Sequence, residues 1–221
     1  MTSRIVLVRH GESEWNRSGR WQGQSGVGLT DAGHAQAGAT AAHLVERYPD
    51  IRLIARSDLQ RVAQTSAPLQ ARLAVPVLVD RRLRELDVGT WSGATHAEVA
   101  AGDGRTLASF HEGADVPAGG AERISDLRRR VGHSLSDVVG WLERMYGGTA
   151  VLLTHGWTAR VATAVLTGLE SGREREVRPL GNCGLVELVA DASGFTVTAH
   201  DQHDHLASAG VPVTRSGVAR A

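Results

Sequence analysis

The stretch "IVLVRHGESEWN", residues 5–16, decides the fold of this chain. Its four apolar residues, 5–8, form a short run that is typical of a buried strand. An arginine, a histidine and a glycine follow this run at once. In an open α/β sheet, ligands bind in the crevice outside the carboxyl ends of the strands. The stretch therefore predicts a core strand that carries Arg9 and His10 to a ligand crevice.

Strand-like runs alternate with helical patterns along the rest of the chain. This alternation is typical of βαβ units and of a mainly parallel sheet. The predicted strands are residues 4–8, 51–55, 77–79, 150–153, 184–190 and 195–200. The predicted helices run over residues 30–48, 57–73, 124–145 and 156–169.

Three local signals support these helices. Thr30 can cap the first helix, and Ser57 with Gln60 forms a capping-box pattern at the start of the second. Residues 124–145 carry one apolar seam at spacings of three and four. Residues 88–122 have weak periodicity and are interpreted as a lid with one or two short helices. We expect one domain over residues 1–207 and a disordered tail over residues 208–221.

The composition excludes several classes of protein. The chain has 221 residues, 42% of them hydrophobic, and 24 basic residues balance 24 acidic ones. This balance argues against bulk binding of nucleic acid or of an acidic membrane. No apolar run approaches the ~20 residues of a membrane span, and the N-terminus lacks the layout of a signal peptide. The single cysteine, Cys183, cannot form an internal disulfide, so we expect a buried thiol in a cytoplasmic protein.

All of the basic residues are arginines, because the chain contains no lysine. This excludes a P-loop lysine, a Schiff-base lysine and a Ser-x-x-Lys nucleophile. Arginine stays protonated in proteins and cannot act as a general base. Proton transfer must therefore fall to His, Asp, Glu, Tyr or Cys.

Two further strand ends carry polar residues of the same kind. "RSDLQRVAQT", residues 56–65, puts Arg61 in the first turn of a helix, and "LTHGWTA", residues 153–159, puts His155 between a strand and a helix. We expect both to share the crevice with Arg9 and His10, where helix N-termini add an anion-binding dipole.

Two arginines and two histidines suit a compact, multiply charged anion such as phosphate. The guanidinium charges lower the pKa of nearby imidazoles, which keeps one histidine neutral for in-line attack on phosphorus. Glu85, in "RRLRELDVGTWSG", is the best-placed carboxylate to protonate the leaving alkoxide.

Other interpretations of these residues stay open at this point. Arg61 could be a surface ion-pair partner of Asp58, and Asp87, Glu98 or Glu112 could serve in place of Glu85. The arginines at 128–130 are expected on the solvated face of their helix. The histidines at positions 200, 203 and 205 suggest a metal, but no cysteine or carboxylate pattern completes a tetrahedral set. We therefore interpret His200, His203 and His205 as residues of a solvent-exposed strand end.

The chain resembles the histidine phosphatase superfamily, which is also called phosphoglycerate-mutase-like. The resemblance rests on Arg9-His10-Gly11 within "RHGESEWNRSGRWQGQSGVGLTDAGHAQA" and covers residues 4 to about 206. It implies an α/β fold of three layers, αβα, with one antiparallel strand in the sheet and a small helical lid. It also implies that His10 is transiently phosphorylated and that Glu85 is the acid and base. The other residues that it places near the phosphate or the substrate are Arg9, Arg61, His155, Asn16, Ser13, Gln22, Gly23, Gly156 and Trp157.

The chain departs from the family pattern at a few positions. The loop 26–30 lacks the acid and the proline that are common there, and Val62 replaces an alanine. Trp157 is bulkier than the small residue usual at its position. We expect it to narrow the pocket or to stack on a substrate, as Trp21 and Trp91 could also do.

The same chemistry serves a phosphatase and a mutase. Residues 88–122 contain five acidic residues and one arginine, Arg105, which argues against a clamp for a bisphosphate. We therefore expect a metal-independent phosphatase without a cofactor, hydrolysing a small-molecule phosphomonoester such as a sugar phosphate or a glycosylated phosphoglycerate. The weakly charged lid favours a neutral or small organic alcohol part. The alternatives are a bisphosphoglycerate-dependent mutase and a non-catalytic member that binds phospho-ligands or proteins. We expect no nucleic-acid or membrane partner, and a homodimer is the assembly to consider.

Overall fold

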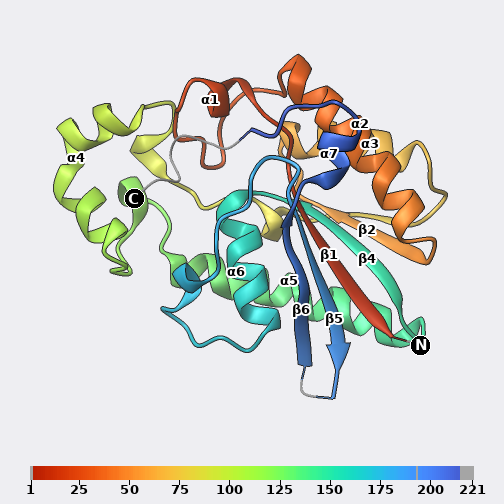
Figure 1. The fold of residues 1–221 in the computed structure, drawn as a ribbon. Helices are drawn as coiled ribbons and strands as arrows, with labels where there is room; N and C mark the ends of the chain where they lie inside the picture. The colour runs from red at the N-terminus through yellow and green to blue at the C-terminus, as the bar shows by residue number, and fades with distance from the viewer. Residues whose placement is uncertain (1, 193, 215–221) are drawn as a thin grey trace.

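The computed structural model describes residues 2–192 and 194–214 and has a six-stranded sheet between two layers of helices (Figure 1). The order of the strands is β3-β2-β4-β1-β5-β6. β5 runs antiparallel to both β1 and β6, and the other pairs are parallel. The predicted α/β fold, with a mainly parallel sheet and one antiparallel strand, is confirmed. The strands are β1 (Ser3–Arg9), β2 (Ile51–Arg56), β3 (Val77–Val79), β4 (Gly148–Thr154), β5 (Leu185–Asp191) and β6 (Gly194–Gln202).

β1 lies in the middle of the sheet. Leu7 pairs with Leu152 of β4 on one side and with Val186 of β5 on the other. The side chains of residues 5–8 are at most 1% exposed. A strand with both faces covered carries apolar residues without alternation, which explains the continuous run. Because β1, β2 and β4 are parallel, the residues that follow them meet at one edge of the sheet.

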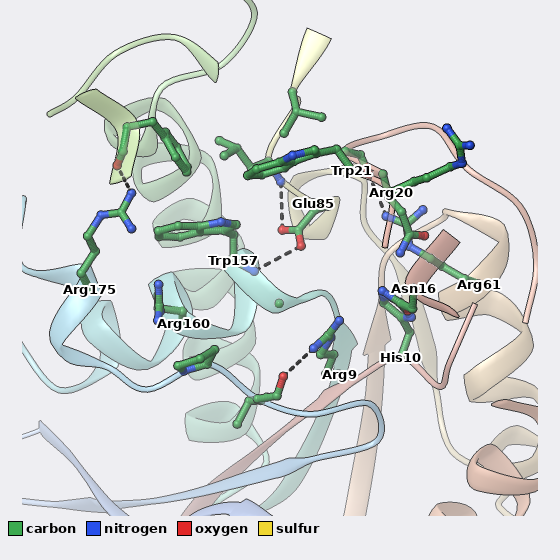
Figure 2. A pocket seen from close by; sticks show the side chains of 18 of the residues that line it. Arg9, His10, Asn16, Arg20, Trp21, Arg61, Glu85, Trp157, Arg160 and Arg175 are labelled. Atoms are coloured by element: carbon green, nitrogen blue, oxygen red, sulfur yellow. Dashed lines mark hydrogen bonds between the residues drawn. The ribbon is translucent and has the colours of Figure 1, made fainter. Parts of the chain in front are cut away.

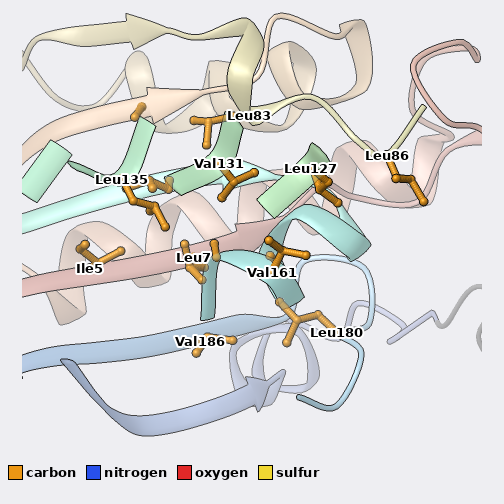
Figure 3. Close-up of a cluster of buried hydrophobic side chains, with 14 of the residues drawn as sticks. Ile5, Leu7, Leu83, Leu86, Leu127, Val131, Leu135, Val161, Leu180 and Val186 are labelled. Carbon is orange, nitrogen blue, oxygen red and sulfur yellow. The ribbon is translucent and has the colours of Figure 1, made fainter. Parts of the chain in front are cut away.

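The helices cover both faces of the sheet. Val6 and Val8 of β1 belong to the buried cluster that includes residues of α2 and α3. Ile5 and Leu7 point the opposite way and join the cluster with residues of α5 and α6 (Figure 3). Burial of each such side chain contributes about 1.5–3 kcal/mol to folding. The helices are α1 (Glu14–Arg17), α2 (Asp31–Arg47), α3 (Gln60–Gln70), α4 (His96–His111), α5 (Ile124–Arg144), α6 (Gly156–Leu166) and α7 (Asp204–Ser208).

The seam predicted for residues 124–145 is the buried face of α5. Five of its apolar residues are at most 2% exposed: Leu127, Val131, Leu135, Val138 and Leu142. Met145 is 40% exposed because the helix ends at Arg144 and the chain turns away at Tyr146, where φ is 58°. None of the helices that the structure describes has both the length and the apolar character needed to cross a bilayer.

The lid, residues 88–122, contains α4 between two short helical turns, Gly89–Trp91 and Ala118–Gly120. α4 is kinked at Asp103, whose φ and ψ are −142° and 43°. Phe110 of α4 packs on the rings of Trp21 and Trp91, with centroids 6.2 and 5.8 Å away. Both indoles are at most 6% exposed. Trp91 and Phe110 of the lid therefore both pack on Trp21, which holds the lid against the rest of the protein, and Trp91 does not line the cavity.

Two helix predictions were wrong at their ends. α3 begins at Gln60 with Leu59 as its N-cap, and no side chain caps it. The Ser57 hydroxyl lies 3.0 Å from His155 Nε2, so it serves a tertiary contact in place of the predicted capping box. α3 also ends at Gln70, and α6 at Leu166, three residues earlier than predicted in each case.

The prediction of a disordered tail from residue 208 is wrong for residues 208–214. Gln36 Nε2 donates hydrogen bonds to the Pro212 carbonyl (2.9 Å) and to Thr214 Oγ1 (3.0 Å). The Asn182 amide donates to the Thr214 carbonyl at 3.0 Å. These polar partners lie far away in the sequence, so local composition could not reveal them. Residues 215–221 lie outside the described residues.

Candidate active site

His10 lies at the end of β1, in a cavity between the sheet and the lid (Figure 2). Its ring is 2% exposed, and Nδ1 lies 2.7 Å from the Gly11 carbonyl. A carbonyl oxygen only accepts hydrogen bonds, so Nδ1 carries the proton and Nε2 keeps a lone pair. Burial and the charges of Arg61 and Arg9 hold the pKa of His10 well below its usual 6.5. The ring is therefore neutral at neutral pH.

Arg61 is held at the cavity by backbone carbonyls. Its Nη2 donates to the Gly23 carbonyl (2.7 Å) and its Nη1 to the Ser25 carbonyl (2.8 Å). Burial lowers its pKa to about 10, so it remains cationic at neutral pH. Asp58, the surface partner considered for Arg61, is bound by Arg84 at 2.6 and 2.7 Å. The ion-pair alternative is therefore wrong.

His155 lies directly behind His10 and does not line the cavity. The two ring centroids are 5.3 Å apart, and His155 is fully buried. Its Nδ1 accepts a hydrogen bond from Arg61 Nε at 3.2 Å, and its Nε2 faces the Ser57 hydroxyl. Burial and the Arg61 charge hold its pKa well below 6.5. A neutral His155 thus orients Arg61 from the side away from the ligand.

Glu85 is held at the N-terminus of α6 by both carboxylate oxygens. Oε2 accepts from the Trp157 amide at 3.2 Å, and Oε1 accepts from the amides of Leu86 (3.0 Å) and Thr158 (3.2 Å). Positive helix N-termini favour such a carboxylate. Among the described residues that line the cavity, Glu85 is the one acid. The alternatives lie elsewhere, since none of Asp87, Glu98 and Glu112 lines it.

Gly156 lies beside both Arg9 and Glu85. A Cβ atom at Gly156 would lie 3.6 Å from Glu85 Oε2 and 3.7 Å from Arg9 Nε. Arg9 itself is 7% exposed and donates a hydrogen bond from Nη1 to the Leu180 carbonyl at 2.5 Å. The acid and the cation therefore face one region of the cavity across a residue that has no side chain.

Four of the remaining predicted residues line the cavity: Asn16, Gln22, Gly23 and Trp157. Ser13 is fully buried and lies behind them, with its hydroxyl 3.1 Å from Asn16 Oδ1 and 3.0 Å from Gln22 Oε1. Gly23 has a φ of 54°, and a Cβ atom there would lie 2.7 Å from a Val88 methyl group. Only glycine suits this turn, which presents the carbonyl that binds Arg61.

The arginine run 128–130 is not simply a solvated face, as predicted. Arg130 donates to the carbonyls of Arg82 (2.8 Å), Arg84 (2.6 Å) and Glu85 (2.8 Å) and pairs with Glu122 at 2.7 Å. Its guanidinium therefore fixes the segment that presents Glu85. The seam pattern of α5 did not reveal this contact, because it depends on how α5 lies against residues 82–85.

Sequence reasoning also missed part of the cavity wall. Arg20, Arg160 and Arg175 line it together with Phe110 and His111 of the lid. The expectation of a neutral alcohol part, based on the weak charge of residues 88–122, overlooked these arginines because they lie outside that segment. One signal was available: Arg160 follows Trp157 by three residues and so lies on the same face of α6. Among the residues that the structure describes, five arginines line the cavity, namely Arg9, Arg20, Arg61, Arg160 and Arg175.

The histidines near the end of β6 have different partners. His205 Nε2 lies 3.0 Å from Thr40 Oγ1, and its ring stacks on His43 at 5.0 Å. His203 faces the Asp201 carboxylate at 3.5 Å. Within residues 2–192 and 194–214, no three His, Cys, Asp or Glu side chains are grouped so that they could hold a metal ion.

Residues 5–203 match the sequence profile of the histidine phosphatase superfamily (branch 1). The chain belongs to this superfamily. The predicted family is thereby confirmed.

Other histidine phosphatases resemble this chain over most of their length. A glucosyl-3-phosphoglycerate phosphatase of Mycolicibacterium vanbaalenii is 37% identical over 189 residues, which cover 84% of this chain and 83% of that protein. A probable phosphoglycerate mutase of Yersinia pestis is 31% identical over 210 residues, covering 91% and 94% of the two chains. A solved structure of a mycobacterial glucosyl-3-phosphoglycerate phosphatase in complex with VO3 superposes with a TM-score of 0.82 at 30% identity, covering 91% of this chain and all of the other.

Proposed function

We propose that this histidine phosphatase hydrolyses a small-molecule phosphomonoester through a phosphohistidine at His10. The observation that carries the proposal is the bond between His10 Nδ1 and the Gly11 carbonyl. It leaves the Nε2 lone pair of a neutral, buried imidazole as the nucleophile. Arg9 and Arg61 line the same cavity and supply the donors that a clamped phosphoryl group needs.

In the first step, the Nε2 lone pair attacks phosphorus and the bond from phosphorus to the ester oxygen breaks. The departing oxygen takes a proton from the Glu85 carboxylic acid and leaves as the alcohol. Arg9 and Arg61 stabilise the negative charge on the transferred phosphoryl group by electrostatic attraction. His10 then carries the phosphoryl group on Nε2.

In the second step, water attacks the phosphohistidine. The Glu85 carboxylate accepts a proton from that water, the nitrogen–phosphorus bond breaks, and inorganic phosphate leaves. His10 returns to its neutral form with Nδ1 still bound to the Gly11 carbonyl. Asn16 and Gln22, which line the cavity, are assigned to the phosphate and to the substrate.

Glucosyl-3-phosphoglycerate is the first substrate to test, because the relatives at 34–37% identity carry that name. Sugar phosphates and 3-phosphoglycerate complete the panel. We further propose a cytoplasmic protein and a single domain that includes residues 208–214. Its buried, unpaired Cys183 is consistent with a reducing compartment. Light scattering after gel filtration would decide between a monomer and the homodimer.

A mutase is the second candidate, since relatives at 31–32% identity are named probable phosphoglycerate mutases. Such an enzyme returns the phosphoryl group to a second hydroxyl. The assay is the conversion of 3-phosphoglycerate to 2-phosphoglycerate with and without 2,3-bisphosphoglycerate. We expect release of inorganic phosphate to exceed isomerisation. Isomerisation that depends on the bisphosphate and outpaces phosphate release would favour the mutase.

The test of the phosphatase is replacement of His10. His10→Ala should abolish phosphate release from every ester that the wild type hydrolyses, while the melting temperature shows a folded protein. His34→Ala, on the exposed side of α2, is the matched control and should keep full activity. A ³²P-labelled ester, quenched in alkali, should label the wild type on His10 and not the His10→Ala variant. A wild type that binds esters but releases no phosphate would be the non-catalytic alternative.

A further inference from the structure

Two arginines line the cavity on the side away from His10. Arg160 belongs to α6, and Arg175 belongs to the helical turn Glu174–Glu176. Figure 2 shows both beside Trp157, while His10, Asn16 and Arg61 lie at the opposite side. The proposed phosphoryl transfer uses neither of them. They therefore need another explanation.

Neither arginine has a carboxylate partner among the described residues. Arg160 Nε is buried without a hydrogen bond, and no ion pair is formed by Arg160 or Arg175 within the part of the chain that the structure describes. Arg175 donates to the Phe110 carbonyl. The partly buried Arg84, Arg128 and Arg130, by contrast, each bind an acid at 2.6–2.8 Å. Burial of a cation without an anion is costly. This pair is therefore suited to bind an anion that a ligand supplies.

Trp157 holds the two guanidinium groups in place. The Cζ atoms of Arg160 and Arg175 lie 4.7 and 4.8 Å from the centre of its ring. Arg175 also lies 4.8 Å from the centre of the Phe110 ring. Contacts of this kind stabilise a guanidinium through its face and leave the N–H groups at its edge to bind an anion. The indole of Trp157 thus serves to order two cations.

Arg160 and Arg175 are close enough to repel each other. Burial, and next the neighbouring Arg175, lower the pKa of Arg160 to about 10. A carboxylate on the ligand reduces this repulsion, and its two oxygens match the paired N–H groups at a guanidinium edge.

We propose that Arg160 and Arg175 form a second anion subsite, which binds a carboxylate on the alcohol part of the phosphate ester. This proposal rests on the proposed phosphatase function and narrows its substrate class to phosphorylated hydroxy acids. The phosphoryl group lies at His10 while the carboxylate accepts hydrogen bonds from the two guanidinium edges. Esters of neutral alcohols leave the two arginines without a counterion and bind more weakly.

Two esters isolate the carboxylate. 3-Phosphoglycerate and glycerol 3-phosphate differ only in that a carboxylate replaces a hydroxymethyl group. We expect the wild type to prefer 3-phosphoglycerate by at least tenfold in kcat/KM. If the wild type hydrolyses only glucosylated esters, the same comparison uses glucosyl-3-phosphoglycerate and 2-glucosylglycerol 3-phosphate.

Three variants locate the subsite. Arg160→Gln and Arg175→Gln should each reduce the preference for the carboxylate tenfold or more, chiefly through KM of the acidic ester. Arg129→Gln is the control, since Arg129 lies on the exposed side of α5 and pairs with Asp126. It should keep the wild-type ratio. Arg160 and Arg175 lie on separate segments, so a folding defect in one variant leaves the other as the test.

The outcomes separate the two proposals. A wild type that releases no phosphate from any ester would refute the phosphatase, whatever the role of Arg160. A phosphatase that hydrolyses both members of the pair equally well would refute the carboxylate subsite alone. Equal fractional losses on both esters in a folded Arg160→Gln or Arg175→Gln variant would also refute it, because they would indicate a structural role.

Discussion

Replacement of Arg130 by methionine tests how Glu85 is positioned. The guanidinium donates to the carbonyls of residues 82, 84 and 85 at 2.6–2.8 Å. It also pairs with Glu122 through two nitrogen–oxygen contacts of 2.7 and 2.8 Å. Methionine keeps a similar apolar stem but removes all of these donors. Glu122 and three carbonyls would then each lose one partner, although Glu122 keeps the Asp87 amide.

The expected loss follows from the burial of this pair. The side chains of Arg130 and Glu122 are only 19% and 14% exposed. Breaking a buried pair by removing one partner costs about 3–5 kcal/mol. For a domain of this size, each kcal/mol lowers the melting temperature by about 2–4 °C. We therefore expect Arg130→Met to melt roughly 6–20 °C below the wild type.

Activity should fall as well, because the Glu85 backbone is one of the groups released. A displacement of about 1 Å at a reacting group can cost on the order of a hundredfold in rate. We expect kcat to fall about tenfold to a hundredfold, with a smaller change in KM.

Thermal unfolding by circular dichroism and steady-state phosphate release are the two assays. Arg129→Met is the matched control, since Arg129 and Asp126 are 66% and 37% exposed and such a pair contributes about 0–1 kcal/mol. If Arg130→Met is no less stable and no less active than Arg129→Met, the positioning role of Arg130 is refuted.

Three other predictions concern two glycines of α2, the pH dependence of stability and the effect of a metal chelator on activity. Gly33→Ala should destabilise the protein by several kcal/mol, since the new Cβ atom would lie 2.0 Å from the Glu12 carbonyl oxygen. Gly38→Ala adds a Cβ atom in open space and should stabilise the protein by about 0.4–1 kcal/mol. Urea denaturation measures both changes. The pKa values of His10 and His155 are well below 6.5, so the unfolded state binds more protons below that pH. Stability should thus fall as the pH drops below 6.5, by up to about 1.4 kcal/mol per pH unit for each histidine. A free energy of unfolding that stays constant between pH 7 and 5 would contradict this. Finally, EDTA should leave phosphate release unchanged, and an activity lost with chelator and restored by a divalent metal would overturn the phosphohistidine mechanism.

Periodicity and strand ends were enough to predict the main parts of the fold and the site. The run at residues 5–8 predicted a central strand because only a strand buried on both faces is apolar throughout. His10, Arg61 and His155 follow three strands that proved to be parallel, so they had to converge. The central strand and the convergence of these residues could be predicted because each depends on sheet geometry and on local pattern alone, whereas His155 lies behind His10 and does not line the cavity.

The contacts that sequence could not predict depend on how separate segments pack. Ser57 has the pattern of a helix cap but lies instead against His155, which is 98 residues away. Arg130 lies next to the apolar seam of α5 in the sequence. Its contact with the segment that presents Glu85 depends on where residues 82–85 pack. Arg175 reaches the cavity from a short helical turn without any recognisable motif. In each case a polar side chain had several partners open to it, and tertiary packing selected one.

The central place of β1 has a consequence for how the protein is made. Leu7 needs partners at positions 152 and 186, which follow it by most of the length of the chain. At about 5–20 residues per second, a ribosome needs roughly 10–40 s to synthesise that far. Until β4 and then β5 have been made, the apolar residues 5–8 lack one or both neighbouring strands and are open to aggregation or to a chaperone. The segment that carries His10 is therefore synthesised before both of the strands that flank it and can enter the finished sheet only after β5 has been made.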